Sequence, residues 1–235
     1  MKNCSAKESN NIKQLTNFNI RNMKKIFTIA AGLLMSTALL AQSDKYTTAM
    51  KKNIADLEGA MQKGILPDLA NSFERIADAE KTQWLPYYYA AYCTVMNAYM
   101  EQDKSKTDGI ADKAESLIKK AEELAGGENS ETCVIKSMIA SAHMMVDPQN
   151  RWMQYGPVSS MNITKAKSLD PTNPRPVYLE GQEKFYTPEQ FGGGKALAKE
   201  LFTKALEMFD KFKPATELHP SWGASSTRYF LEQCK

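Results

Sequence analysis

Apolar residues recur with the period of an α-helix through almost the whole chain after residue 42. Met50, Ile54, Leu57 and Met61 fall at positions i, i+4, i+7 and i+11, which places them on one helix face. The same spacing recurs at Leu69, Phe73 and Ile76, at Ile110, Ala114, Leu117, Ala121 and Leu124, and at Leu197, Leu201, Ala205, Met208 and Phe212. The alternation of a half-buried strand is missing from this pattern, so the sequence predicts an all-α protein.

Clusters of Gly, Pro, Asp and Asn separate the helical segments, which gives about eight helices and a further one at the C-terminus. The predicted connections alternate in length. Those at 80–83, 126–130 and 170–174 are short, whereas those at 102–109, 147–156 and 187–194 are long. Because the extra length falls on one class of turn, the sequence predicts insertions along one edge of a helical array, where binding surfaces are common.

Three of the helical segments share an internal pattern. Ile or Phe, then Ala three residues on, then Leu or Met after three more, occurs at 118–124, 163–169 and 202–208. The central alanines, Ala121, Ala166 and Ala205, are 45 and 39 residues apart. A repeat of this size accommodates two antiparallel helices, and it favours a stacked α-solenoid.

The second helix of each unit resembles that of the tetratricopeptide repeat, which carries a small residue, a bulky apolar residue, Ala and then Pro. Ser159, Ile163, Ala166 and Pro171 follow this order. Residues 174–181 resemble the start of the first helix. The likeness covers roughly residues 46–213, and it implies a TPR-like superhelix of about four hairpins. The chain is also similar to exported tetratricopeptide-type proteins of Gram-negative bacteria, which implies a periplasmic location.

A stacked array agrees with the energetics of single helices. Burying four apolar side chains gains roughly 6–12 kcal/mol, whereas ordering about 15 residues costs more. Neighbouring hairpins must therefore complete one another's core. We expect a repeat domain over 42–213 and a C-terminal capping helix within 214–235.

Met23 to Ala41 has the features of a secretory signal peptide. Lys24 and Lys25 precede an apolar run that ends in small residues, and cleavage is expected after Ala41 or Ala38. The apolar run is shorter than the ~20 residues of a membrane-spanning helix. We therefore predict a periplasmic or secreted protein without a membrane span in its mature part, and residues 1–22 are interpreted as an upstream extension that is not native.

Removal of the leader changes the charge of the chain. The full sequence has a net charge of +3, but residues 42–235 carry 24 basic and 26 acidic side chains. This balance gives no basic surface for a nucleic-acid partner. Cys93, Cys133 and Cys234 are odd in number and widely spaced, so they are interpreted as structural thiols rather than as a disulfide framework.

Two motifs contain residue types that are found in nucleotide-binding loops or metal sites, but neither has the spacing that such a site requires. Gly192 to Lys195 follows no strand and lacks the hydroxyl and the first glycine of a nucleotide-binding loop, so it is interpreted as the start of a helix. His143 and Asp147 lie one turn apart, but no third metal ligand is near them in sequence. We therefore expect no cofactor, no metal and no enzymatic activity.

The sequence thus predicts a non-catalytic scaffold that binds a protein or peptide partner in the cell envelope. The candidate contact residues are aromatic, on the first helix of a unit or in the long turns: Tyr87, Tyr89, Trp152, Tyr155, Tyr186 and Phe191. The competing interpretation is that these rings cover the open ends of helix pairs. Two other functions remain open, a helical small-ligand carrier or enzyme without a recognisable motif, and a structural subunit that forms homo-oligomers.

Overall fold

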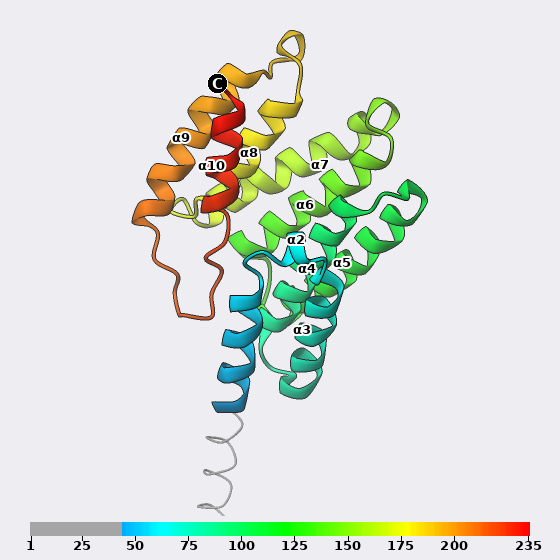
Figure 1. The fold of residues 1–235 in the computed structure, drawn as a ribbon, viewed down its shortest axis with the longest axis vertical. Helices are drawn as coiled ribbons and strands as arrows, with labels where there is room; N and C mark the ends of the chain where they lie inside the picture. The colour runs from blue at the N-terminus through cyan, green and yellow to red at the C-terminus, as the bar shows by residue number, and fades with distance from the viewer. Residues whose placement is uncertain (1–43) are drawn as a thin grey trace, which may run out of the picture. The chain divides into compact units, whose positions relative to one another are not determined.

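The computed structural model describes residues 44–235, so the predicted signal peptide and the predicted upstream extension lie outside the described residues. A division between two units falls after Thr48, and residues 49–235 form the second, compact unit. Residues 44–56 are helical. The later elements are α2 (Ala60–Lys63), α3 (Leu66–Glu80), α4 (Trp84–Met100), α5 (Lys104–Ala125), α6 (Ser130–Val146), α7 (Pro148–Leu169), α8 (Arg175–Tyr186), the short 3₁₀ helix η1 (Glu189–Phe191), α9 (Lys195–Lys211) and α10 (Ala224–Gln233) (Figure 1). The described residues contain no strand, which confirms the all-α prediction.

Successive helices of the second unit pack against one another. The pairs α4–α5, α6–α7 and α8–α9 are in contact, and α10 packs on α9 (Figure 1). In addition, α4 contacts α6 and α6 contacts α8, so these three helices form a row. No helix in the described part of the chain is both long enough and apolar enough to cross a membrane.

The repeated sequence pattern marks the core of this unit. Its central alanines are fully buried, and so are the bulky side chains three residues before them: Ile118, Ala121, Ile163, Ala166, Phe202 and Ala205. The alanines leave room for a neighbouring helix to approach, while the larger side chains fill the space between helices. Cys93 and Cys133 are also buried free thiols, as predicted, and Cys234 is half-buried.

The prediction of long turns within the hairpins is wrong for two of the three. Residues 101–103 alone connect α4 to α5, and Asp147 alone separates α6 from α7. Both aspartates are N-caps, because Asp103 accepts a hydrogen bond from Ser105 N–H and Asp147 accepts one from Asn150 N–H. The extra length therefore lies in α5 and α7, each of 22 residues. Of the three turns that were predicted to be long, only 187–194 is long. Insertions therefore do not lie along one edge of the helical array.

The predicted C-terminal capping segment has two parts. Residues 212–223, which we call the strap, have no regular structure and connect α9 to α10 (Figure 1). The capping helix itself is α10, which packs on α9. The rings of Phe202 and Phe230 stack with their centroids 5.5 Å apart, and this contact fixes α10 on the last hairpin.

Candidate functional site

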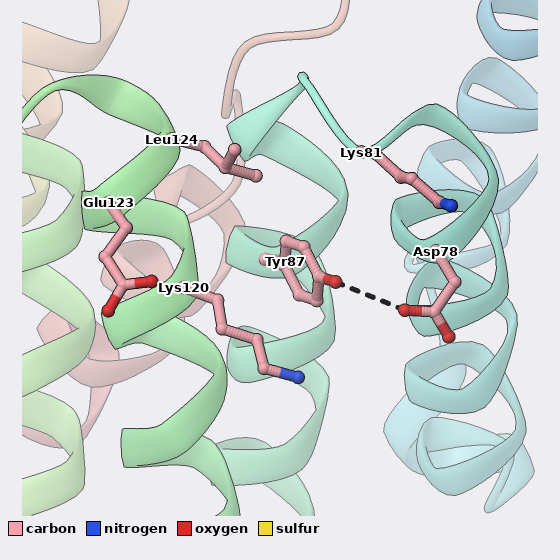
Figure 2. A pocket seen from close by; sticks show the side chains of 6 residues that line it. All are labelled: Asp78, Lys81, Tyr87, Lys120, Glu123 and Leu124. Atoms are coloured by element: carbon pink, nitrogen blue, oxygen red, sulfur yellow. Dashed lines mark hydrogen bonds between the residues drawn. The ribbon is translucent and has the colours of Figure 1, made fainter.

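An open groove lies between α3, α4 and α5. Its volume is about 620 Å³, which lies in the range of small-molecule sites. The lining residues come from the end of α3 and from the facing sides of α4 and α5: Asp78, Lys81, Tyr87, Lys120, Glu123 and Leu124 (Figure 2). We call this hollow the Tyr87 groove. A second hollow of about 200 Å³ beside Asn97 and Lys113 is smaller than most ligand sites.

The ring of Tyr87 lies between the other side chains of the groove. Its hydroxyl donates a hydrogen bond of 3.2 Å to Asp78 Oδ1, and Lys120 Nζ lies 5.2 Å from the ring centroid (Figure 2). Burial, together with this hydrogen bond and the charge of Asp78, raises the pKa of Tyr87 above 10.0. The side chain is therefore a neutral phenol at physiological pH, with an aromatic face beside a cation.

Lys81 lines the groove and has an unusual backbone conformation. It ends α3 with a φ of 55°, a left-handed value that no other non-glycine residue adopts in the described part of the chain. Its N–H donates to Ala77 O at 2.9 Å, which completes the helix terminus. A glycine is the usual choice at such a position, and a lysine there costs roughly 1 kcal/mol. The lysine instead places a cation at the groove rim.

Tyr89, predicted to line a groove, is in the core instead. Only 1% of its surface is exposed, and its ring stacks on Phe73 with the centroids 5.0 Å apart. Its hydroxyl donates a hydrogen bond of 2.9 Å to the carbonyl of Leu218 in the strap. The strap thus occupies part of the face of α4 on which a peptide was expected.

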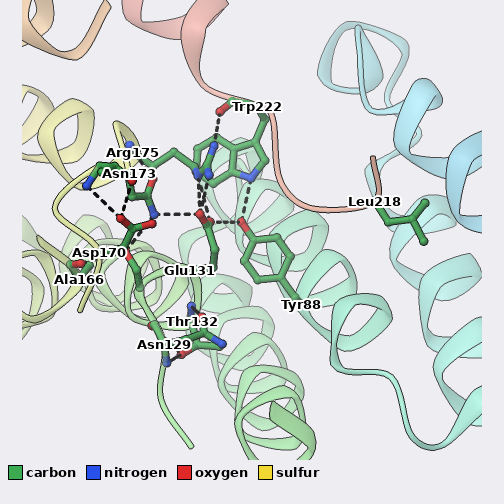
Figure 3. A network of polar contacts seen from close by, with 12 residues as sticks. Tyr88, Asn129, Glu131, Thr132, Ala166, Asp170, Asn173, Arg175, Leu218 and Trp222 are labelled. Atoms are coloured by element: carbon green, nitrogen blue, oxygen red, sulfur yellow. Dashed lines mark hydrogen bonds and ion pairs between the residues drawn. The ribbon is translucent and has the colours of Figure 1, made fainter. Parts of the chain in front are cut away.

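A buried polar network joins the strap to the row formed by α4, α6 and α8. Arg175 of α8 is fully buried and makes a bidentate pair with the carboxylate of Glu131 on α6 (Figure 3). The same carboxylate accepts hydrogen bonds from Tyr88 at 3.0 Å and from Asn173 at 2.8 Å. Trp222 of the strap accepts a hydrogen bond from Arg175 through its carbonyl, at 3.3 Å. Both charges are therefore satisfied by partners, as burial requires.

The other sequence-predicted site residues are not brought together. Trp152 lies on the first turn of α7, 57% exposed, rather than in a loop. Tyr155 on the same helix stacks on His143, with centroids 5.0 Å apart. Tyr186 and Phe191 are 70% and 72% exposed, at the end of α8 and in η1. None of these four rings lines the Tyr87 groove.

The glycines before α9 are required by close packing. A Cβ on Gly193 would lie 2.1 Å from the carbonyl oxygen of Thr187, and Gly192 and Gly194 have φ values of 78° and 107°. Lys184 Nζ donates to Gly192 O at 2.9 Å, and Gly194 N–H donates to Lys184 O at 2.8 Å. The segment therefore folds back on the end of α8.

One cluster of potential metal ligands was missed by sequence reasoning. His143 does not pair with Asp147, because its Nδ1 lies 2.8 Å from Asp108 Oδ1. Ligand atoms of His143, Asp112 and Glu115 lie within 4.8 Å of one another. The sequence signal was the spacing of Asp108, Asp112 and Glu115, at i, i+4 and i+7 on one helix.

Comparison with known proteins identifies one similar solved structure. No family model matches the sequence, so the tetratricopeptide resemblance stays a prediction. No curated protein matches it either. The chain is similar to a structure described as the HusA haemophore from Porphyromonas gingivalis, with 37% sequence identity and a TM-score of 0.73. The match covers 81% of this chain and 92% of that chain.

Proposed function

The chain belongs to the family of the HusA haemophore, and on this basis we propose that it is an exported carrier of haem or of a closely related porphyrin. The observation that carries the proposal is 37% identity over 92% of HusA, whose description is that of a haem carrier. A small-ligand carrier has more support than the peptide scaffold, because residues of the strap already contact Tyr88 and Tyr89.

We further propose that the hairpins stack as in a tetratricopeptide superhelix. The contacts of α4 with α6 and of α6 with α8 support this arrangement, because a row of first helices is what stacked hairpins produce. In such an array each second helix has neighbours on two sides, which agrees with the contacts of α5 with both α4 and α6.

We assign porphyrin binding to the Tyr87 groove. Haem is a flat, largely apolar macrocycle with two carboxylate side chains. Tyr87 and Leu124 provide apolar surface for such a ring, and Lys81 and Lys120 provide cations at the rim for its carboxylates (Figure 2). The groove, of about 620 Å³, is open to solvent and is also lined by Asp78 and Glu123, so it would hold the macrocycle by one part of its surface.

The binding mode in this groove rests on the ring and the carboxylates. None of the described residues that line it is a histidine, cysteine or methionine. Its one tyrosine, Tyr87, donates its hydroxyl hydrogen to Asp78, so we propose that it contributes its ring to the complex. In the proposed complex, affinity comes from contacts with the macrocycle and its carboxylates.

Titration of haemin into the purified protein tests the function and the site. We expect a saturable change in the Soret band, with affinity reduced about ten-fold in Tyr87→Ala. Phe191→Ala is the matched control, an exposed aromatic outside the groove, and it should bind normally. Absence of haemin binding by the unchanged protein overturns the function. If Phe191→Ala loses haemin binding while Tyr87→Ala retains it, the binding site lies near η1 and the end of α8 rather than in the Tyr87 groove.

A further inference from the structure

Three acidic residues of α5 face the last turn of α6. Asp108, Asp112 and Glu115 follow one another at i, i+4 and i+7, so they share one side of the helix. Helices α5 and α6 are in contact, and His143 is on α6 at the level of these carboxylates. The cluster precedes Lys120 along α5 and shares no residue with the Tyr87 groove.

The imidazole of His143 is held rigidly on one side. It is 8% exposed, and its ring stacks on Tyr155 with an interplanar angle of 13°. Its Nδ1 lies 2.8 Å from Asp108 Oδ1, and Arg151 Nη1 donates to both oxygens of Asp108 at 2.7 and 2.9 Å. Nδ1 is therefore occupied by Asp108, whose carboxylate is itself held by Arg151.

The other ring nitrogen, Nε2, lies near two further carboxylates. Nε2 makes no hydrogen bond to any described residue, and Asp112 Oδ1 lies 3.6 Å from it. Ligand atoms of His143, Asp112 and Glu115 all lie within 4.8 Å of one another. In a tetrahedral zinc site with bonds of about 2.1 Å, ligand atoms are about 3.4 Å apart. Asp112 and Glu115 are exposed, so small rotations of their side chains can bring the ligand atoms to this spacing.

We propose that His143, Asp112 and Glu115 bind a divalent transition-metal cation, Zn²⁺ in the first instance, with water in the remaining coordination positions. One imidazole and two carboxylates are ligands that such cations accept. The contact of Asp108 with the other ring nitrogen is the arrangement that orients metal-bound histidines in proteins. The cation would cross-link α5 to α6 and offset the repulsion among the three acidic side chains.

Nuclear magnetic resonance of the histidine rings tests the site directly. The sequence has two histidines, so each ring is readily assigned. His219 is the internal reference, because it lies in the strap with its Nδ1 2.7 Å from Thr216 Oγ1. On addition of ZnCl₂ to the porphyrin-free protein, we expect the Nε2 resonance of His143 to shift with one-to-one stoichiometry and to return with EDTA. The resonances of His219 should not move.

A pair of double variants separates the site from adventitious binding. Asp112→Asn with Glu115→Gln removes two ligands that are exposed, so the fold should be retained, and we expect zinc affinity to fall at least about ten-fold. Glu207→Gln with Asp210→Asn is the matched control on α9, where an exposed acidic pair has the same three-residue spacing. It should bind zinc as the unchanged protein does.

Two results would overturn the proposal. The first is a His143 ring that does not respond to zinc and behaves only as a protonated partner of Asp108 and Asp112. The second is equal zinc affinity in the Asp112/Glu115 variant and the unchanged protein. Haemin titration of the same samples is a separate readout, so failure of the metal site leaves the carrier function standing, and the reverse also holds.

Discussion

The indole Nε1 of Trp222 donates a hydrogen bond of 2.9 Å to the hydroxyl of Tyr88, a residue 134 positions earlier in the chain (Figure 3). The Trp222 ring also stacks on Tyr92 of the same helix, with centroids 4.5 Å apart. Together these contacts attach the strap to α4. They make the strap part of the folded core rather than a loose connection between α9 and α10.

Trp222→Ala should lower the free energy of unfolding by about 3–5 kcal/mol, because it removes a large packed ring and leaves a cavity. Trp222→Phe should lower it less, since a ring remains against Tyr92 while the hydrogen bond to Tyr88 is lost. Urea denaturation followed by circular dichroism measures both. Trp152→Phe, at an exposed position, is the control and should stay within about 0.5 kcal/mol of the unchanged protein.

Glu131→Gln should destabilise the protein by about 3–5 kcal/mol, because it leaves the charge of Arg175 buried without its counter-ion. The comparison is Glu217→Gln, which breaks the surface pair of Glu217 with Lys51. Both side chains of that pair are more than half exposed, so the expected loss is below about 1 kcal/mol. Equal losses in the two variants would contradict a structural role for the buried pair.

Lys81→Gly should stabilise the protein and weaken porphyrin binding at once. Glycine adopts the left-handed conformation at the end of α3 without strain, which is worth about 1 kcal/mol in thermal or chemical unfolding. The loss of the rim cation should reduce haemin affinity by up to about five-fold. Lys81→Ala separates the two effects, because it loses the charge without relief of the backbone. Lys81→Ala should therefore bind haemin as weakly as Lys81→Gly does, but its free energy of unfolding should not exceed that of the unchanged protein.

Metal-free protoporphyrin should bind with nearly the same affinity as haemin. The reason is that the residues proposed to hold the macrocycle contact its ring and carboxylates. Fluorescence titration with protoporphyrin, run beside absorbance titration with haemin, measures the difference. A much weaker affinity for the metal-free ring would show that iron is coordinated by a side chain of the protein.

Stability should depend on pH through Glu128. Hydrogen bonds from Lys136 and Lys165 lower the pKa of Glu128 from 4.5 to about 2. Because the folded-state value is the lower one, the contribution of this carboxylate is present above pH 4.5 and is lost as the pH falls toward 2. Unfolding measured across this interval should show a stability difference from Glu128→Gln that shrinks as the solution becomes more acidic. A constant difference would contradict the assignment.

The helices were predictable because their burial follows a local period. Ile118, Ala121 and Ile163 are buried as the spacing indicated. The ends of the helices were harder to predict, because Asp and Pro occur both in turns and at helix starts. Asp147 and Pro148 were interpreted as a loop, whereas the aspartate caps α7 and the proline occupies its first turn. The sequence alone does not separate these outcomes.

The candidate sites depended on contacts that no local pattern reveals. Tyr87 and Tyr89 lie two residues apart on α4, yet one borders an open groove and the other is buried beneath the strap. Residues 212–223 have no helical period, so their course over α4 was not predictable. His143 was considered beside Asp147 and rejected as a metal ligand, because the residues that it meets lie 28 to 35 positions earlier and reach it only through the packing of α5 on α6.

The strap also has a consequence for how this protein can change in evolution. Repeat proteins ordinarily gain or lose units by duplication, because each unit contacts only its neighbours. Here residues 212–223 reach from the last hairpin to α4, and they contact Arg175 of α8 on the way. An added hairpin would carry Trp222 out of reach of Tyr88, and a deleted one would leave surplus chain. In the stack proposed above, the strap therefore fixes how many helix pairs can lie between α4 and Trp222.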